Sequence, residues 1–170
     1  MYVYLFFGDM EGTPDQLGDP EAVTYLAVTT GPYGAIGKVE VENLADLKDI
    51  LAAVHEAGGR SVETAVAIAS GLHTEFPRNK RPEKPTVEAF VQIWVDPGAG
   101  DEVLHALDRF KGVSGLAAVA GDFDILAVVG GMSFDDLAET ILEGLQHIDG
   151  ISATTTSFIV AEVKRRDQAS

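Results

Sequence analysis

The chain has 170 residues, of which 46% are hydrophobic and none is cysteine, so disulfides, thiolate catalysis and cysteine-ligated metals are excluded. There are 12 Lys and Arg residues against 27 Asp and Glu residues, and the formal net charge is −15. Sequence-independent binding of DNA or RNA needs basic side chains near the phosphates, so a direct nucleic-acid partner is not expected.

Membrane and export signals are not found in the sequence. No apolar run approaches the roughly 18 residues of a membrane span. The start Met1-Tyr2-Val3-Tyr4 lacks the basic segment and apolar stretch of a signal peptide. The sequence therefore predicts a cytoplasmic protein without a membrane partner.

The sequence resembles itself at a shift of 90 positions, which predicts an internal repeat. The matches fall at turns, at helix starts and at a constant phase of the apolar pattern. They include Gly8 and Gly98, Leu17 and Leu107, Val23 and Val113, Leu26 and Leu116, Gly31 and Gly121, Val39 and Val129, Leu47 and Leu137, and Thr64 and Thr154. We expect a degenerate repeat at 1–70, a linker at 71–85, a second repeat at 86–164 and a tail at 165–170.

The first repeat predicts the order strand, helix, strand, strand, helix, strand. The expected ranges are 3–7, 14–17, 25–30, 35–41, 44–55 and 62–69. The first helix is short because Gly and Pro residues interrupt it. Asn43 and Asp46 carry the side chains of a capping box at the start of the second helix.

A segment rich in proline and basic residues follows, from Gly71 to Pro85. It shows no apolar periodicity and contains Pro77, Arg78, Lys80, Arg81, Pro82, Lys84 and Pro85. This composition favours an extended, solvated linker over a contact for an anionic partner.

The second repeat predicts the same order of elements. Its expected strands are 89–95, 116–119, 125–129 and 154–163, and its first helix covers 103–110. Ser133 caps the second helix, with Asp136 returning the bond, and Gly150 ends it.

This order is that of an α+β fold with an antiparallel four-stranded sheet and helices on one face. Residues 90–95 and 125–129 are apolar at nearly every position, whereas a sheet that is covered on one side alone should alternate. We therefore expect two tandem ferredoxin-like (βαββαβ) domains of the dimeric α+β barrel type, packed as an internal pseudo-dimer.

Short motifs mark the second repeat from Glu88 to Lys164. Besides the apolar first strand, they are Pro97-Gly98, Gly112-Val113, Gly121-Asp122-Phe123-Asp124, Asp136-Leu137 and the run from Gly150 to Thr156. In this order and spacing, they resemble the effector-binding (RAM) domain of the Lrp/AsnC family of amino-acid-responsive regulators. Members usually carry a helix-turn-helix DNA-binding domain ahead of it, which is not found in this sequence.

The resemblance implies an effector site at the hairpin phrase Gly121, Asp122, Phe123 and Asp124, with Thr154 and Thr156 from the last strand. A free amino acid offers an ammonium group for Asp, and a carboxylate for hydroxyls and backbone N–H groups. The alternative is structural, since Gly-Asp is ordinary in tight turns and Thr is ordinary in strands.

The first repeat keeps Gly31, Tyr33 and Thr64 of this pattern. Gly34 stands in the place of Asp124, and Val66 stands in the place of Thr156. We expect that a site built from the first repeat's own residues has been lost.

No catalytic motif is found. His55, His73, His105 and His147 lack HxH or HExxH spacing, and no Ser-His-Asp order or phosphate-binding glycine loop is present. We therefore expect no enzyme activity, no metal and no cofactor. The alternative is an enzyme of the dimeric α+β barrel type, a monooxygenase or a haem-linked enzyme, for which Trp94 and His105 are the residues to test.

The leading hypothesis is a non-enzymatic protein that binds an amino acid or a similar small metabolite and self-associates. Mixed assembly with full-length regulators is a related possibility, because such an assembly needs no DNA contact from this chain. A ligand-free assembly partner of a regulator is the remaining alternative.

Overall fold

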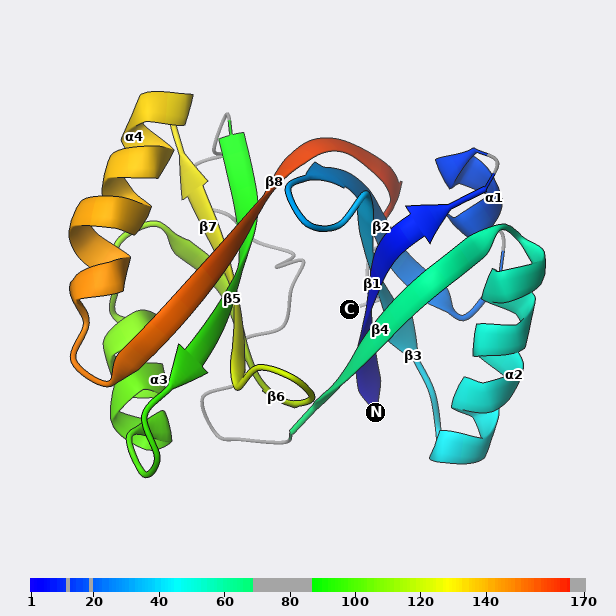
Figure 1. Ribbon diagram of the computed structural model, residues 1–170, viewed down its shortest axis with the longest axis horizontal. Helices are drawn as coiled ribbons and strands as arrows, with labels where there is room; N and C mark the ends of the chain where they lie inside the picture. The colour runs from blue at the N-terminus through cyan, green and yellow to red at the C-terminus, as the bar shows by residue number, and fades with distance from the viewer. Residues whose placement is uncertain (12, 19, 69–86, 166–170) are drawn as a thin grey trace. The chain divides into compact units, whose positions relative to one another are not determined.

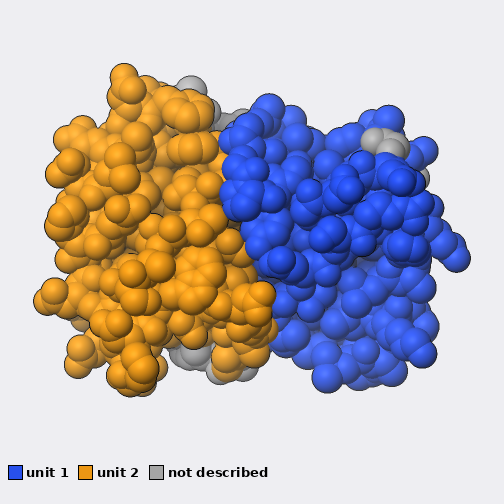
Figure 2. Space-filling model, in the orientation of Figure 1, with its two compact units in different colours: residues 1–67, 159–170 blue, residues 68–158 orange. Residues whose placement is uncertain are grey.

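The computed structural model describes residues 1–11, 13–18, 20–68 and 87–165. The chain divides into two compact units, unit 1 with residues 1–67 and 159–170 and unit 2 with residues 68–158 (Figure 2). The expected linker at 71–85 lies outside the described residues, as does the tail from residue 166. The domain boundaries proposed from the sequence stay predictions.

Unit 1 is a four-stranded antiparallel sheet with two helices on one face (Figure 1). Its strands follow the order β4-β1-β3-β2, which is that of a split βαβ arrangement. The elements are β1 (Tyr2–Met10), α1 (Pro14–Gly18), β2 (Val23–Thr30), β3 (Ala35–Glu40), α2 (Leu44–Glu56) and β4 (Gly59–Ala67).

Unit 2 has the same architecture, with the strand order β8-β5-β7-β6 (Figure 1). The elements are β5 (Val87–Val95), α3 (Gly100–Asp108), β6 (Val113–Ala120), β7 (Ile125–Gly131), α4 (Phe134–Glu139) and β8 (Ile151–Arg165). Residues of β8 from Ile159 onward group with unit 1. The predicted α+β class and antiparallel sheet are confirmed, and the internal pseudo-dimer stays a prediction.

Each unit has its own core between the sheet and the helices. In unit 1, Phe7 of β1 and Leu17 of α1 belong to one cluster of buried side chains. In unit 2, Ile93, Leu107 and Leu137 belong to the corresponding cluster. Alternate strand residues meet the apolar stripes of the helices, as the period-2 and period-3.6 patterns predict.

The second helix of unit 2 is not the regular α-helix that its sequence pattern predicts. After α4 the chain forms a π-helix at Thr140–Gly144 and a 3₁₀-helix at Leu145–His147. Gly144 lies so close to Phe110 that a Cβ atom at this position would overlap the phenyl ring. The connection from β7 to β8 is also two residues longer than the one from β3 to β4, and a π-turn takes up extra residues within a helix.

The shift of 90 positions holds in the structure for β2, β3, β6 and β7. The β-bulge after Val23 recurs after Val113, in the pairing of each strand with its neighbour. The shift fails for the first strands. Ala35 and Ile125 are 90 positions apart, but their partners Phe7 and Ile93 are not. The match of Gly8 with Gly98 is therefore wrong: the first lies within β1, and the second lies in the turn after β5.

Two glycines with positive φ test how closely the backbone packs at the ends of these strands. Gly58 has φ 112°, and a Cβ atom there would overlap the carbonyl oxygen of Glu11, whereas Gly98 has φ 83° and nothing within 4 Å. We expect Gly98→Ala to cost about 1–2 kcal/mol of unfolding free energy, from backbone strain alone. Gly58→Ala should cost about 3 kcal/mol or more, because steric overlap adds to the strain.

Urea unfolding of the two variants measures this difference. Equal losses of unfolding free energy would show that the close approach of Gly58 to Glu11 is relieved at no cost.

Candidate functional site

The turn between β6 and β7 lies at the end of the sheet where β5 also ends. Asp124 donates its backbone N–H to the carbonyl of Ile93 at 3.0 Å, and Val119 donates to the carbonyl of Asp124 at 2.9 Å. The turn is further fixed by Trp94, whose Nε1 donates to the carbonyl oxygen of Asp122 at 2.7 Å. Phe123 is 4% exposed and meets the Trp94 ring edge-on, with the ring centroids 6.0 Å apart.

The Asp124 carboxylate is held at this end of the sheet. Its Oδ2 accepts the backbone N–H of Val95 at 2.9 Å, just beyond the last β5–β7 backbone pair. The residue is exposed, so the carboxylate is accessible to solvent and to a ligand. The rest of the turn therefore positions one accessible carboxylate.

A pocket of about 530 Å³ lies next to Asp124 within unit 2. Among the described residues that line it, three are carboxylates and none is basic: Asp96, Asp101 and Asp124. The other lining residues are small or apolar: Ile68, Val95, Pro97, Gly98, Gly100, Leu104, Ala118, Val119 and Ile125. A pocket with apolar walls and a few convergent polar groups is typical of a small-molecule site.

The first turn of α3 presents backbone N–H donors, which carry positive partial charge, to the same pocket. Its N-cap residue, Ala99, makes no side-chain hydrogen bond to the helix. The first N–H groups of a helix have no acceptor within the helix, and Gly100 and Asp101 line the pocket. The pocket can therefore receive an ammonium group at Asp124 and a carboxylate at the start of α3.

Thr154 and Thr156 lie elsewhere in unit 2. They pair with Ile93 and Val91 of β5, two core residues, so their side chains point to the helix-covered face of the sheet. The Thr154 hydroxyl accepts a hydrogen bond from Nε2 of Gln146 at 3.0 Å. Neither threonine is among the residues that line the pocket.

The structure thus separates the residues proposed from the sequence into two groups. One continuous turn is formed by Gly121, Asp122, Phe123 and Asp124. Of its two carboxylates, that of Asp124 lines the pocket. Asp96 and Asp101, the other two carboxylates that line the pocket, were not predicted from the sequence. The available signal was that the turn after β5 and the β6–β7 turn must lie at the same end of an antiparallel sheet.

Unit 1 closes the equivalent turn with the same backbone bonds. Gly34 donates to Phe7 at 2.9 Å, and Thr29 donates to Gly34 at 3.0 Å. There is no carboxylate at Gly34, and a Cβ atom there would lie 3.1 Å from the terminal methyl of Met10. Met10 therefore packs where the Asp124 side chain begins in unit 2.

The strand register also changes which unit 1 residues correspond to the two threonines. Val62 pairs with Phe7, as Thr154 pairs with the equivalent Ile93. Two residues further on, Thr64 takes the place of Thr156. The alignment of Thr64 with Thr154 and of Val66 with Thr156 is therefore wrong, because the connection before β8 is two residues longer.

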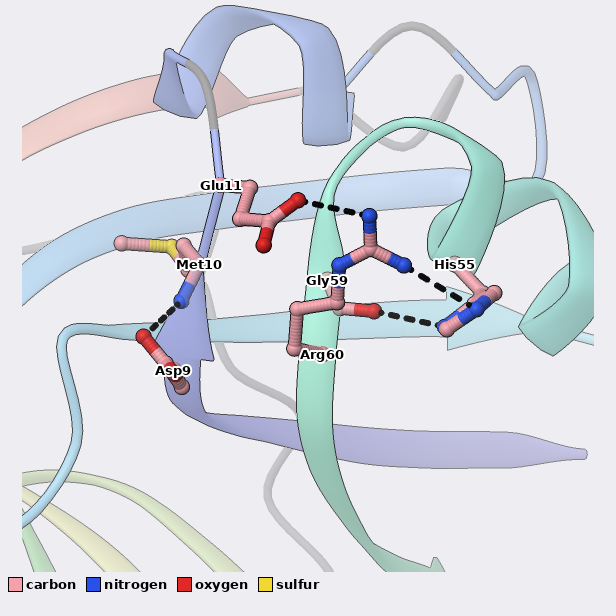
Figure 3. A network of polar contacts seen from close by, with 6 residues as sticks. All are labelled: Asp9, Met10, Glu11, His55, Gly59 and Arg60. Carbon is pink, nitrogen blue, oxygen red and sulfur yellow. Dashed lines mark hydrogen bonds and ion pairs between the residues drawn. The ribbon is translucent and has the colours of Figure 1, made fainter.

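A polar network holds the end of β1 in unit 1 (Figure 3). Arg60 Nη2 donates to Glu11 Oε2 at 2.6 Å, and Arg60 Nη1 lies 3.2 Å from Nε2 of His55. The other ring nitrogen of His55 contacts the carbonyl of Gly59 at 3.1 Å and must donate to it. Because the pair between Arg60 and Glu11 is exposed, it contributes at most about 1 kcal/mol to stability.

His105, named for the enzyme alternative, lies on α3. In the described parts of the chain, no group of three His, Asp or Glu side chains is arranged to hold a metal ion. His105 contacts the carbonyl of Asp101 through Nδ1 at 2.8 Å, four residues back on its own helix. Within the same residues, no helix has the length and apolarity to cross a membrane.

Comparison with known proteins finds a family match in the second half of the chain. Residues 88–169 match the family model of the Lrp/AsnC ligand binding domain. YugG of Bacillus subtilis, an uncharacterized HTH-type transcriptional regulator, is 32% identical over 81 residues, 46% of this chain and 49% of YugG. PH0140 of Pyrococcus horikoshii, of the same description, is 32% identical over 99 residues, 57% of this chain and 63% of that protein. This chain thus spans about half to two thirds of the length of these relatives.

The whole chain also has a structural relative. The crystal structure of the siroheme decarboxylase NirDL covers 98% of this chain and 73% of its own, with a TM-score of 0.73. The sequence identity is 13%, so the likeness concerns the fold alone.

The contact between Phe123 and Trp94 is the testable element of this turn. Phe123→Ala should lower the unfolding free energy by about 3–5 kcal/mol, because it empties a buried site. It should also shift the emission of Trp94, the single tryptophan, to longer wavelengths, as the indole loses its cover.

Asp122→Ala is the matched control. It keeps the backbone carbonyl that accepts from Trp94, so the unfolding free energy should change by no more than about 0.5 kcal/mol. An unchanged Trp94 emission in Phe123→Ala would contradict this account of the turn.

Proposed function

Because residues 88–169 match the Lrp/AsnC ligand binding domain, we propose that this protein binds an amino-acid-type effector in the pocket beside Asp124. In this role it is a regulator-related, non-enzymatic protein. The observation that carries the proposal is the pocket of about 530 Å³ that joins the Asp124 carboxylate to the uncapped start of α3.

The ligand's charges follow from the two ends of the pocket. An ammonium group binds at Asp124, and a carboxylate binds the N–H groups at Gly100 and Asp101. The apolar wall, with Leu104 and Ile125, takes the ligand's side chain. Asp96 and Asp101 disfavour ligands with a second negative charge, since like charges at close range raise the free energy of binding.

The other proposed residues have distinct roles. Gly121, Asp122 and Phe123 position Asp124 through the turn and through Trp94. Thr154 and Thr156, on the helix-covered face of β8, form a second candidate group whose substitution should affect ligand binding less than substitution of Asp124.

Partner proteins are part of the proposal. The curated relatives are described as uncharacterized HTH-type transcriptional regulators. We propose that this chain self-associates, and mixed assembly with full-length regulators is the related alternative. Its net charge of −15 supports contact with protein partners rather than with DNA.

Thermal unfolding against each of the twenty amino acids tests the ligand-binding role. A ligand that binds the folded state alone stabilises it by about 2.7 kcal/mol at a concentration of 100 Kd, which raises the midpoint by about 5–10 °C. Asp124→Asn should abolish the shift, because the amide keeps the shape and removes the charge. Asp49→Asn, on an exposed face of α2, should keep it.

A shift that survives in Asp124→Asn would move the site away from this pocket. No shift with any amino acid would favour a ligand-free assembly partner. Trp94 emission provides an independent readout, since its indole is bonded to the same turn.

The enzyme alternative rests on the fold shared with NirDL, a siroheme decarboxylase. Titration with an iron porphyrin, followed by visible absorbance, separates the two proposals. We expect no saturable change in the porphyrin spectrum. A saturable change that His105→Ala removes would favour the enzyme alternative.

A further inference from the structure

Apolar side chains are exposed at the start of α4 in unit 2. Met132 is 64% exposed and Phe134 is 57% exposed. The Phe134 ring lies on the ring of Phe158 in β8, with the centroids 4.6 Å apart, and Phe158 packs against the unit 2 core. Phe134 and Phe158 therefore form an apolar patch that is continuous with the core, and with the exposed Met132, two residues before Phe134 in the chain, they are here called the α4 surface.

The backbone of this patch is held in place. Ser133 caps α4 by accepting the N–H of Asp136 at 3.1 Å, and Oδ2 of Asp136 accepts the N–H of Met132 at 2.8 Å. Phe134 is thus displayed from a fixed helix start, which lowers the entropy cost of binding through it.

The helical segment that begins at the α4 surface carries charge of a single sign. Residues 132–144 include Asp135, Asp136, Glu139 and Glu143 and no Lys, Arg or His. Asp135 follows Phe134 in the chain, and the Asp136 carboxylate accepts a hydrogen bond from the backbone N–H of Met132. An apolar patch beside negative charge complements a partner segment that presents apolar side chains flanked by Lys or Arg.

The equivalent place in unit 1 lacks this combination. Leu44 occupies the same helix position and is 65% exposed, but Ala45 replaces the carboxylate of Asp135. Lys48 adds a positive charge one turn further on. The two helix starts therefore provide a matched pair, alike in exposure and different in charge.

We propose that the α4 surface binds a basic amphipathic helix of a protein partner, with Phe134 as the aromatic anchor. A second copy of this chain fits less well, because it would bring Asp135 and Asp136 of one copy into the field of a chain whose net charge is −15. Aromatic side chains with a fixed backbone often carry most of the affinity at such contacts.

Fluorescence anisotropy with a labelled peptide tests the proposal on the intact chain. The probe has about 18 residues, about five helical turns, with Leu on one face and Lys on the other. The comparison peptides are a scrambled sequence of the same composition and a version with Glu in place of Lys. We expect the Leu and Lys helix to bind at least about tenfold more tightly than either.

The variants locate the contact. Phe134→Ser should weaken binding at least about tenfold, and Asp135→Lys should weaken it about threefold or more, with a smaller dependence on salt. Leu44→Ser and Glu102→Lys are the matched controls for apolar loss and for charge reversal in a first helical turn, and they should change the Kd by less than about twofold.

Three results would overturn the proposal. The first is equal binding of the scrambled peptide, and the second is an equal effect of Phe134→Ser and Leu44→Ser. The third is self-association that Phe134→Ser abolishes in sedimentation velocity, which would assign the α4 surface to a second copy. Far-UV circular dichroism checks folding. If Phe134→Ser does not fold, the effects of Met132→Ser and Asp135→Lys on the peptide Kd test the proposal instead.

Discussion

The antiparallel register between β5 and β7 positions the pocket of unit 2. It sets Ile93 opposite Ile125, so that the next turn residue, Asp124, closes the ladder through its backbone and reaches Val95 through its side chain. A slip of one residue would reverse the face of every side chain in β5 and move Asp124 away from the start of α3. Both ends of the pocket depend on this pairing.

The elements were predictable because their signals are local. Alternating and helical apolar spacing, the turn at Gly121 to Asp124 and the cap at Ser133 each involve residues that are close in sequence. The π-helix was not predictable from local spacing, and it ends at Gly144, which packs against Phe110, more than thirty residues earlier in the chain.

Sequence reasoning identified one part of the candidate site and missed another, for a related reason. Asp124 was identified through a family motif, whereas Asp96 and Asp101 lie on other elements and meet it in space alone. Thr154 and Thr156 were also identified through the family resemblance, whereas their unit 1 counterparts were assigned by sliding the sequence without gaps, which hid the longer connection before β8. Their orientation follows from pairing with Val91 and Ile93, and pairing is set by tertiary structure.

Comparison of the two units separates what the turn needs for folding from what it could need for binding. The same two backbone bonds form at Gly34 and at Asp124, so the hairpin closes without a carboxylate. The Asp124 carboxylate, which is exposed at the pocket and accepts the N–H of Val95, is thus an addition to a hairpin that closes in the same way in unit 1. In unit 1 the corresponding space beside Gly34 is filled by Met10, whose flexible apolar side chain adapts to such gaps.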